Sequence, residues 1–332
     1  MDAASPLRSL RIVDDTGSLF AARPVEFHAR EIKSEAFGWN IANARLADIL
    51  AKPLDASPNL ERVAAKVDSF DFSGAIAAVV TADGRRFSAR LVVGADGRTS
   101  IARKAAGIAA RSHRYGQSAL TMFLAHTRSH DDFSTEFHTR QGPFTLVPLP
   151  GSGEARFRSS LVWVMSEAEA RRRDSLGDET LAFEIEDRAH GLIGAVQIED
   201  ERGVFPLVRQ SAARLTAKRL ALVGDAAHAF PPIGAQGLNL GLRDVEGLLH
   251  AAKAARMDGG DIGGEAALAR YAASRRPDIA LRTMAVDGLN WSLLADFAPV
   301  DALRGLGLTA LRHVGPLRRL VMREGVAPAL AR

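Results

Sequence analysis

Apolar and polar residues alternate in short runs along the first third of the chain, and this spacing predicts β-strands. One segment is different, because Leu46, Ile49 and Leu50 recur at the spacing of a helix face. Asn43 stands just before them, so we expect a helix over residues 44–51 that this asparagine caps. The strands of this part are expected within residues 10–32 and at 61–70, 75–81 and 87–93.

The middle of the chain continues with β-type runs, and two charged helical stretches fall within residues 166–190. Strands and helices do not alternate one by one, which favours an antiparallel sheet with helices beside it. In the last third, a short buried strand at 219–225 precedes helices over most of residues 237–325. Pro316 should divide the tail into two helices, because an interior proline breaks a helix. The central strands are expected at residues 120–125, 144–149, 157–165 and 195–207.

The composition is that of a soluble globular protein, with 47% hydrophobic and 25% charged residues in a chain of 332. The absence of cysteine excludes disulfides, thiolate-held metal clusters and cysteine nucleophiles, and it favours a reducing compartment. The first residues have neither the basic nor the apolar region of a signal peptide, and no apolar run approaches the ~18 residues of a membrane span. We therefore expect a cytoplasmic protein that is at most peripheral on the inner face of a membrane.

The formal net charge of +4 is concentrated in the tail, where six arginines and two acids lie between Asp301 and Arg332. A nucleic-acid binder needs a basic face over its body, so this distribution argues against that class. The tail has an amphipathic pattern that fits docking on an anionic bilayer, whereas the alternative is helices packed on the core or on a dimer partner. The apolar residues that alternate with the arginines are Leu303, Leu306, Leu311, Val314, Leu317 and Leu320.

The longest motif follows the strand predicted at residues 219–225. Asp225 stands where that strand ends, so its carboxylate can accept hydrogen bonds from the hydroxyls of a sugar-like chain. Pro231 and Pro232 stiffen the next loop, and Gly237 lets amides at a helix N-terminus approach an electron-accepting ring. A polyol chain joined to such a ring describes a flavin.

A second motif has Asp96 and Gly97 after a strand, with Ser100 and Arg103 on the first turns of a helix. The amides of a helix N-terminus and one cation would face an anionic segment of a cofactor, such as a pyrophosphate. Either aspartate could instead be a turn or capping residue, and the length of its motif makes the cofactor role the stronger hypothesis for Asp225.

Together the two motifs resemble those of the FAD-dependent aromatic hydroxylases, the group A flavoprotein monooxygenases, and more closely the branch that hydroxylates ubiquinone precursors. Three further segments resemble the same branch: Phe37-Gly38-Trp39 with Asn43, Tyr271-x-x-x-Arg275-Arg276-Pro277, and Gly315-Pro316-Leu317-Arg318-Arg319-x-x-Met322-Arg323. The resemblance implies FAD, a reductant such as NAD(P)H, and insertion of one oxygen atom of O2 into the ring of a polyprenyl phenol.

The resemblance also implies an α/β fold with α+β character. A Rossmann-like FAD-binding domain would comprise residues 1–110 and 211–290, an antiparallel sheet over 111–210 would bind substrate, and helices would form the C-terminal part, 291–332. A homodimer or a complex of ubiquinone-biosynthesis proteins would fit the family.

The flavin itself supplies the chemistry, so no catalytic acid or base is expected, and His228 is expected to pack beside the flavin loop. His126 and His130 lie four residues apart without a third ligand, and no metal site is expected. The resemblance implies that the cofactor is bound by Asn43, Asp96, Gly97, Arg103, Gly224, Asp225, Pro232, Gly234, Gln236, Gly237, Leu238 and Asn239.

The sequence departs from the family at its start, because the family opens with a strand, a Gly-x-Gly-x-x-Gly turn and a helix that hold the ADP half of FAD. That motif is not found in these 332 residues. Two interpretations follow: Met1 is an internal start of a longer protein, or the chain is a truncated flavoprotein with impaired activity. The rival hypotheses are an accessory quinone-binding protein, and another flavoprotein chemistry such as a prenyl reductase or a halogenase.

Overall fold

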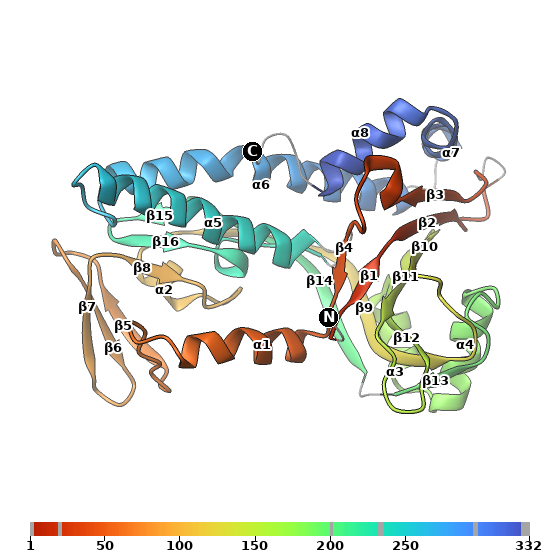
Figure 1. Ribbon diagram of the computed structural model, residues 1–332, viewed down its shortest axis with the longest axis horizontal. Helices are drawn as coiled ribbons and strands as arrows, with labels where there is room; N and C mark the ends of the chain where they lie inside the picture. The colour runs from red at the N-terminus through yellow and green to blue at the C-terminus, as the bar shows by residue number, and fades with distance from the viewer. Residues whose placement is uncertain (1–2, 19–21, 200–201, 232–235, 295–297, 327–332) are drawn as a thin grey trace. The chain divides into compact units, whose positions relative to one another are not determined.

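The computed structural model describes residues 3–18, 22–199, 202–231, 236–294 and 298–326 (Figure 1). The chain divides into two compact units. The first comprises Met1–Leu60, Gly116–Pro206 and Gly288–Arg332, and the second comprises Glu61–Tyr115 and Leu207–Asp287. Residues 1–60 therefore group with the central sheet, whereas the sequence analysis placed them with the cofactor-binding segments.

The first unit is built on a mostly antiparallel sheet in the order β9-β12-β11-β10-β2-β3, and β13 and β14 also pair with β9. Only β10 and β2 are parallel among the described strands of this order. The antiparallel sheet expected in the middle of the chain is confirmed. Its strands are β2 (Ser9–Asp14), β3 (Val25–His28), β9 (Ala110–His126), β10 (Phe133–Thr139), β11 (Gly142–Leu149), β12 (Phe157–Ser166), β13 (Val196–Ile198) and β14 (Gly203–Ala212).

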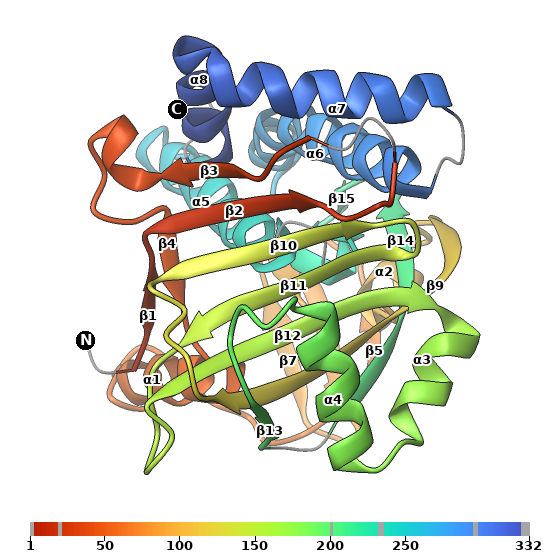
Figure 2. The ribbon, with the colours of Figure 1, turned by 90° about the vertical axis from the view of Figure 1, so that its right-hand side faces the viewer.

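One face of this sheet is buried by α3 (Glu167–Asp174) and α4 (Asp178–Arg188), which lie in front of it in Figure 2. Alternate residues of a strand point to the same face, so Leu161 and Trp163 of β12 both enter the core. The Trp163 ring meets Phe144 edge-on, with 5.1 Å between the ring centroids. The two helical stretches expected within residues 166–190 are thereby confirmed.

The first unit also contains α1 (Asn43–Asp55), which confirms the helix expected over residues 44–51. The expected asparagine cap is wrong, since Ala42 occupies the cap position in extended backbone and no side chain caps the helix. The helix simply begins one residue earlier than its apolar spacing indicates, so Asn43 is its first residue. Three short elements complete this part: β1 (Ser5–Leu7), the 3-10 helix η1 (Ala29–Ile32) and β4 (Gly38–Asn40), which pairs with β1.

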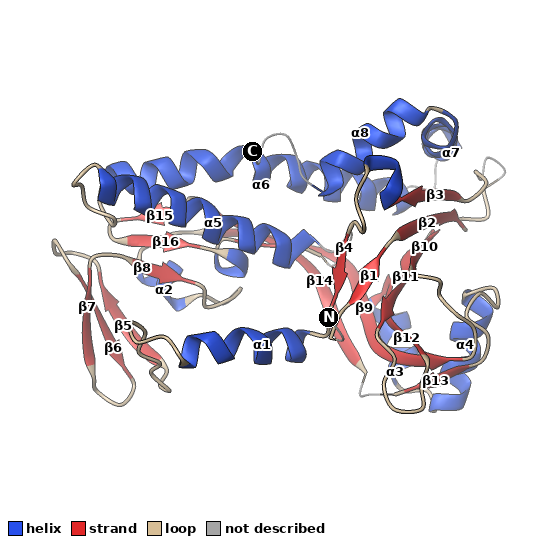
Figure 3. Ribbon diagram, in the orientation of Figure 1, coloured by secondary structure: helices blue, strands red, loops and turns tan. Residues whose placement is uncertain are grey.

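The C-terminal part is helical, as Figure 3 shows, with α7 (Ala298–His313) followed by α8 (Gly315–Val326). The predicted break at Pro316 is confirmed, and this proline stands in the first turn of α8, where its missing N–H costs nothing. Leu308 of α7 and Met322 of α8 pack against Val25 and Phe27 of β3. No described helix has both the length and the apolar character that crossing a bilayer requires.

The second unit contains two small sheets. In one, β8 (Val92–Gly94) and β16 (Leu220–Leu222) are parallel neighbours, and β15 (Thr216–Ala217) pairs with the other side of β16. The other sheet is the antiparallel set β5 (Val67–Asp71), β6 (Ala77–Thr81) and β7 (Arg86–Ala89), which confirms most of the predicted strands. The core around β16 includes Leu240 of α5 (Gln236–Met257) and Tyr271 of α6 (Glu265–Leu294), two helices that lie beside β15 and β16 in Figure 1.

Candidate functional site

The end of β16 leads directly into the 3-10 turn η2 (Gly224–Ala226), which carries Asp225. Gly224 has a φ of +58°, a left-handed conformation that favours glycine. Helix α5 packs closely here, because a Cβ added at Gly241 would lie 3.3 Å from the Cα atom of Gly224. Asp225 is exposed, whereas Ala226 beside it is buried. Among the described residues, none forms a hydrogen bond or ion pair with the Asp225 carboxylate, so its oxygens are available to a ligand.

The two motifs lie side by side within the second unit. Gly94 of β8 pairs with Leu222 of β16, and each motif follows the carboxyl end of its strand. Ligands of open α/β folds bind outside the carboxyl ends of parallel strands. The Asp-Gly and Gly-Asp motifs therefore lie together at one edge of this small sheet, where the two parallel strands end.

Arg103 joins the two motifs. Arg103 is 4% exposed, and its guanidinium donates to the carbonyl oxygens of Ala226 and Arg98, at 2.7 Å in each case. Ala226 directly follows Asp225, so this side chain holds the backbone of the turn. Both terminal nitrogens of Arg103 donate to carbonyl groups of the protein. The contact between Arg103 and a pyrophosphate that the resemblance implies stays a prediction.

Asp96 caps α2 (Ile101–Ala105). Its Oδ2 accepts hydrogen bonds from the amides of Ile101 and Ala102, at 2.7 and 3.1 Å. Ser100 accepts from the Arg103 amide at 2.9 Å, so the first amides of this helix are already partnered. Gly97 has a φ of +77°, which gives this turn its shape. Of the two roles considered for Asp96 from the sequence, the structure shows the contact with the helix amides. A contact between Asp96 and the cofactor stays a prediction.

The first turn of α5 presents Gly237, Leu238 and Asn239. Leu238 and Asn239 are exposed, and a Cβ added at Gly237 would meet no atom of the described residues within 4 Å beyond the helix's own backbone. The predicted contacts Pro232 and Gly234 lie outside the described residues, as does the side chain of Gln236. Asn43 belongs to the first unit, where it begins α1.

The arrangement fits a flavin, because an exposed carboxylate with no partner among the described residues stands at the end of one parallel strand, and a helix whose first turn carries exposed residues follows in the chain. The profile described as "FAD binding domain" matches residues 47–285, which is more than half of the chain. This chain belongs to the family of the FAD binding domain. The fold class and the FAD cofactor expected from the sequence are thereby confirmed.

Named relatives agree with this membership. The chain is 37% identical over 327 residues to the ubiquinone hydroxylase UbiL of Rhodospirillum rubrum, spanning 97% of this chain and 73% of that protein. It is 30% identical over 300 residues to the 3-demethoxyubiquinol 3-hydroxylase of Escherichia coli, spanning 90% of this chain and 75% of that protein. These relatives show that the chain is an FAD-dependent monooxygenase, which confirms the family expected from the sequence, and they favour a hydroxylase over the accessory protein and the other flavoprotein chemistries.

Solved structures share the fold at low identity. The p-nitrophenol 4-monooxygenase PnpA of Pseudomonas putida DLL-E4 superposes with a TM-score of 0.76 at 19% identity, covering 97% of this chain and 80% of PnpA. PqsL of P. aeruginosa, in complex with 2-aminobenzoylacetate, gives 0.76 at 23% identity, covering 92% of this chain and 82% of PqsL.

This monooxygenase also contains a buried set of charges that the sequence analysis did not assign. Asp244 of α5 accepts hydrogen bonds from the Gly224 amide, at 3.0 Å, and from Nε2 of His228, at 2.6 Å. Its other oxygen accepts from Nε of Arg275 in α6, at 2.9 Å. Arg275 in turn donates to Asp278, also at 2.9 Å. His228 thus lies beside the turn that carries Asp225, and its Nε2 faces a carboxylate.

Three arginines, Arg243, Arg275 and Arg282, pair with Asp278. Burial alone would raise the pKa of Asp278, but hydrogen bonds from Arg282 and Arg275 outweigh it and hold that pKa below its ordinary value. Arg275 stands in a segment quoted above for its resemblance to the family, whereas Asp244 lies on α5, beyond the Gly-Asp turn. The helical pattern could not reveal that two residues on different helices face each other.

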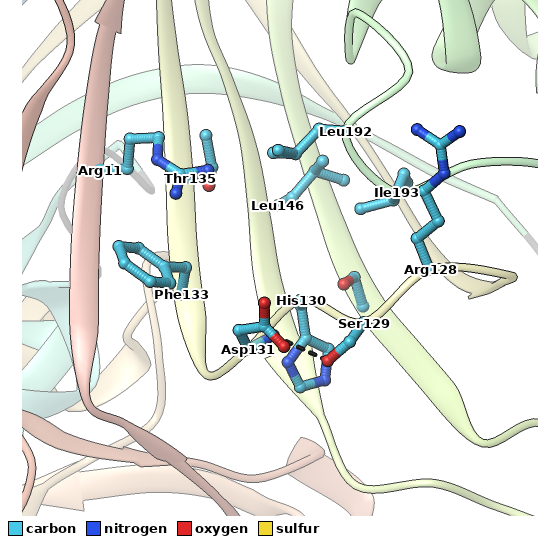
Figure 4. Close-up of a pocket in the computed structure, with 11 residues that line it drawn as sticks. Arg11, Arg128, Ser129, His130, Asp131, Phe133, Thr135, Leu146, Leu192 and Ile193 are labelled. Carbon is cyan, nitrogen blue, oxygen red and sulfur yellow. Dashed lines mark hydrogen bonds between the residues drawn. The ribbon is translucent and has the colours of Figure 1, made fainter.

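The first unit holds a cavity of about 340 Å³ beside the connection between β9 and β10, lined in part by Arg11, His130 and Ser159 (Figure 4). His130 accepts a hydrogen bond from the Asp132 amide at 3.1 Å. The neighbouring His126 uses Nδ1 on the Arg128 carbonyl and Nε2 on Ser159. Burial lowers the pKa of both histidines. The described residues contain no group of three His, Cys, Asp or Glu that could hold a metal.

Proposed function

We propose that this FAD-dependent monooxygenase hydroxylates the aromatic ring of a polyprenyl phenol on the route to ubiquinone, using O2 and a reductant such as NAD(P)H. The observation that carries the proposal is the match to a ubiquinone hydroxylase over 97% of the chain, which includes the whole Gly-Asp motif. The exposed Asp225 carboxylate and the parallel strand edge support the cofactor part of it.

When bound, FAD supplies electron transfer from the reductant and activation of O2. The protein binds and orients it: Asp225 accepts hydrogen bonds from the ribityl hydroxyls, and Gly237 to Asn239 contact the ring. Asp96 and Arg103 shape the neighbouring turn. Residues 1–110 and 211–290 are proposed to hold the cofactor, and the sheet over 111–210 the substrate.

The function is tested by product analysis of the purified chain supplied with FAD, NADH, a prenylated phenol and 18O2. We expect one 18O atom in the ring of the product, measured by mass spectrometry. A product reduced in its prenyl chain, or a halogenated one in the presence of halide, would favour the rival chemistries. A protein that stays colourless after FAD is added would contradict the cofactor assignment.

We further propose that α7 and α8 dock on an anionic bilayer, such as the inner face of the cytoplasmic membrane. Although Leu308 and Met322 pack inward, five apolar side chains of these helices are 40–65% exposed. Exposed arginines accompany them, and a cationic, apolar surface matches anionic lipid. The exposed apolar residues are Leu306, Val314, Leu317, Leu320 and Val321, and the exposed arginines are Arg312, Arg319 and Arg323.

The membrane contact is tested by sedimentation with vesicles of phosphatidylcholine, with and without phosphatidylglycerol. We expect binding to the anionic vesicles alone and loss of that binding in Leu320→Glu. Leu54→Glu is the matched control, because Leu54 lies on α1 and is 44% exposed, against 58% for Leu320. Equal sedimentation of both variants would contradict the proposal. A change in oligomeric state of Leu320→Glu would instead indicate a homodimer or a complex.

A further inference from the structure

The turn that carries Asp225 is held from behind by a carboxylate on α5. Asp244 is fully buried and sits 20 residues beyond Gly224 in the sequence. One of its oxygens, Oδ2, accepts from both the Gly224 amide and His228 Nε2, while Oδ1 accepts from Arg275. A single side chain thus connects the residue before Asp225 to the one three positions after it.

From these contacts we infer that Asp244 is a positioning residue for the flavin site, which acts through the backbone of Gly224 and the ring of His228. The inference rests on the proposed function, because it is the flavin that would meet Asp225. Hydrogen bonds to a charged acceptor are stronger than those between neutral groups, and Asp244 accepts three hydrogen bonds. Gly224 has no side chain, so its position depends on its backbone contacts.

Asp244 also determines which nitrogen of His228 carries the proton. A carboxylate only accepts hydrogen bonds, so Nε2 is the protonated nitrogen of the ring. Nδ1 is buried and has no hydrogen-bond partner among the described residues. The backbone of His228 is held by β17 (His228–Ala229), in which His228 pairs with Ser211 of β14.

Asp244 is itself held by α6. Arg275 bridges Asp244 and Asp278, and Arg282 completes the row with a 2.8 Å hydrogen bond to Asp278. Asp278 is 2% exposed and resembles Asp244 in burial and in pairing with Arg275, but its hydrogen bonds and ion pairs within the described residues go to arginines and not to the turn. The chain therefore offers a matched control within one network.

The experiment compares Asp244→Ala with Asp278→Ala by two measurements. The first is hydrogen–deuterium exchange of the peptide spanning residues 220–230, in protein without added FAD. Local opening exposes backbone amides to exchange. We expect exchange in Asp244→Ala to be at least tenfold faster than in Asp278→Ala, equivalent to about 1.4 kcal/mol. Equal rates would overturn the inference.

The second measurement is the dissociation constant for FAD, from quenching of flavin fluorescence. Asp244→Ala should bind at least tenfold more weakly than Asp278→Ala, and Asp244→Asn should recover part of the loss because its amide oxygen still accepts. Equal affinities of the two alanine variants would overturn the role. If the wild-type chain binds no FAD, the proposed function fails, and the exchange measurement still decides whether Asp244 holds the turn. If Asp244→Ala does not fold, Asp244→Asn takes its place against Asp278→Asn in both measurements.

Discussion

Asp225→Ala is expected to abolish flavin binding while leaving the fold intact. Hydrogen bonds to a charged group contribute about 1.5–3 kcal/mol each, so the loss of two to the ribityl chain would weaken binding by at least about a hundredfold. The carboxylate has no partner among the described residues, so its removal should change the free energy of unfolding by no more than about 0.5 kcal/mol. Fluorescence titration with FAD and denaturant unfolding measure the two effects.

Two further variants control this result. Asp225→Asn keeps one acceptor oxygen and should retain part of the affinity. Asp258→Ala removes a carboxylate that is 70% exposed in the same unit, and it should bind FAD like the wild type. An Asp225→Ala protein with unchanged affinity for FAD would refute the assigned role of this residue.

Arg103→Met is expected to destabilise the protein strongly and to weaken flavin binding as a consequence. The substitution removes the donor of the Ala226 carbonyl group, whereas the Arg98 carbonyl still accepts from Nε2 of Gln210 at 2.8 Å. An unsatisfied buried polar group costs about 1–3 kcal/mol, so we expect a loss of about that size in the free energy of unfolding. Urea denaturation followed by circular dichroism measures it.

The control for this prediction lies in the same motif. Arg98 is exposed, so Arg98→Met should leave stability nearly unchanged. Arg103→Lys keeps the charge but cannot satisfy both carbonyl groups in the same geometry, and it should fall between the two. If Arg103→Met lowers FAD affinity without any loss of stability, Arg103 contacts the cofactor directly, as the sequence resemblance implied, and the backbone role is wrong.

The sequence predicted most strands and helices but missed β10 entirely. This strand has Ser134 and His138 on one face, and both are buried. His138 bonds to Glu136 on the same face, at 2.8 Å. A strand whose buried positions are polar does not show the alternation that identifies strands in a sequence. The first half of β9 was missed for a related reason, because its residues from 110 to 114 are all exposed.

By itself, the sequence determined the family and the cofactor, and it singled out Asp225 as the residue predicted to bind that cofactor. The Gly-Asp motif is one continuous segment, in which the strand β16, the turn with Asp225 and the start of α5 follow one another. The order of residues in this segment therefore suffices to identify the motif. Helix boundaries were predicted less well, because α1 begins one residue before and ends four residues after its predicted range, and the ends of α5 and α6 were not predicted.

Only the tertiary structure decided what holds that motif in place. Arg103 reaches the carbonyl group of a residue 123 positions away, and Asp244 meets an arginine 31 positions away on another helix. The sequence around Arg103 and Asp244 does not distinguish a solvated charge from a ligand of the cofactor. Burial is what separates the roles, because a buried charge must find its partners within the fold, and those partners are set by how strands and helices pack.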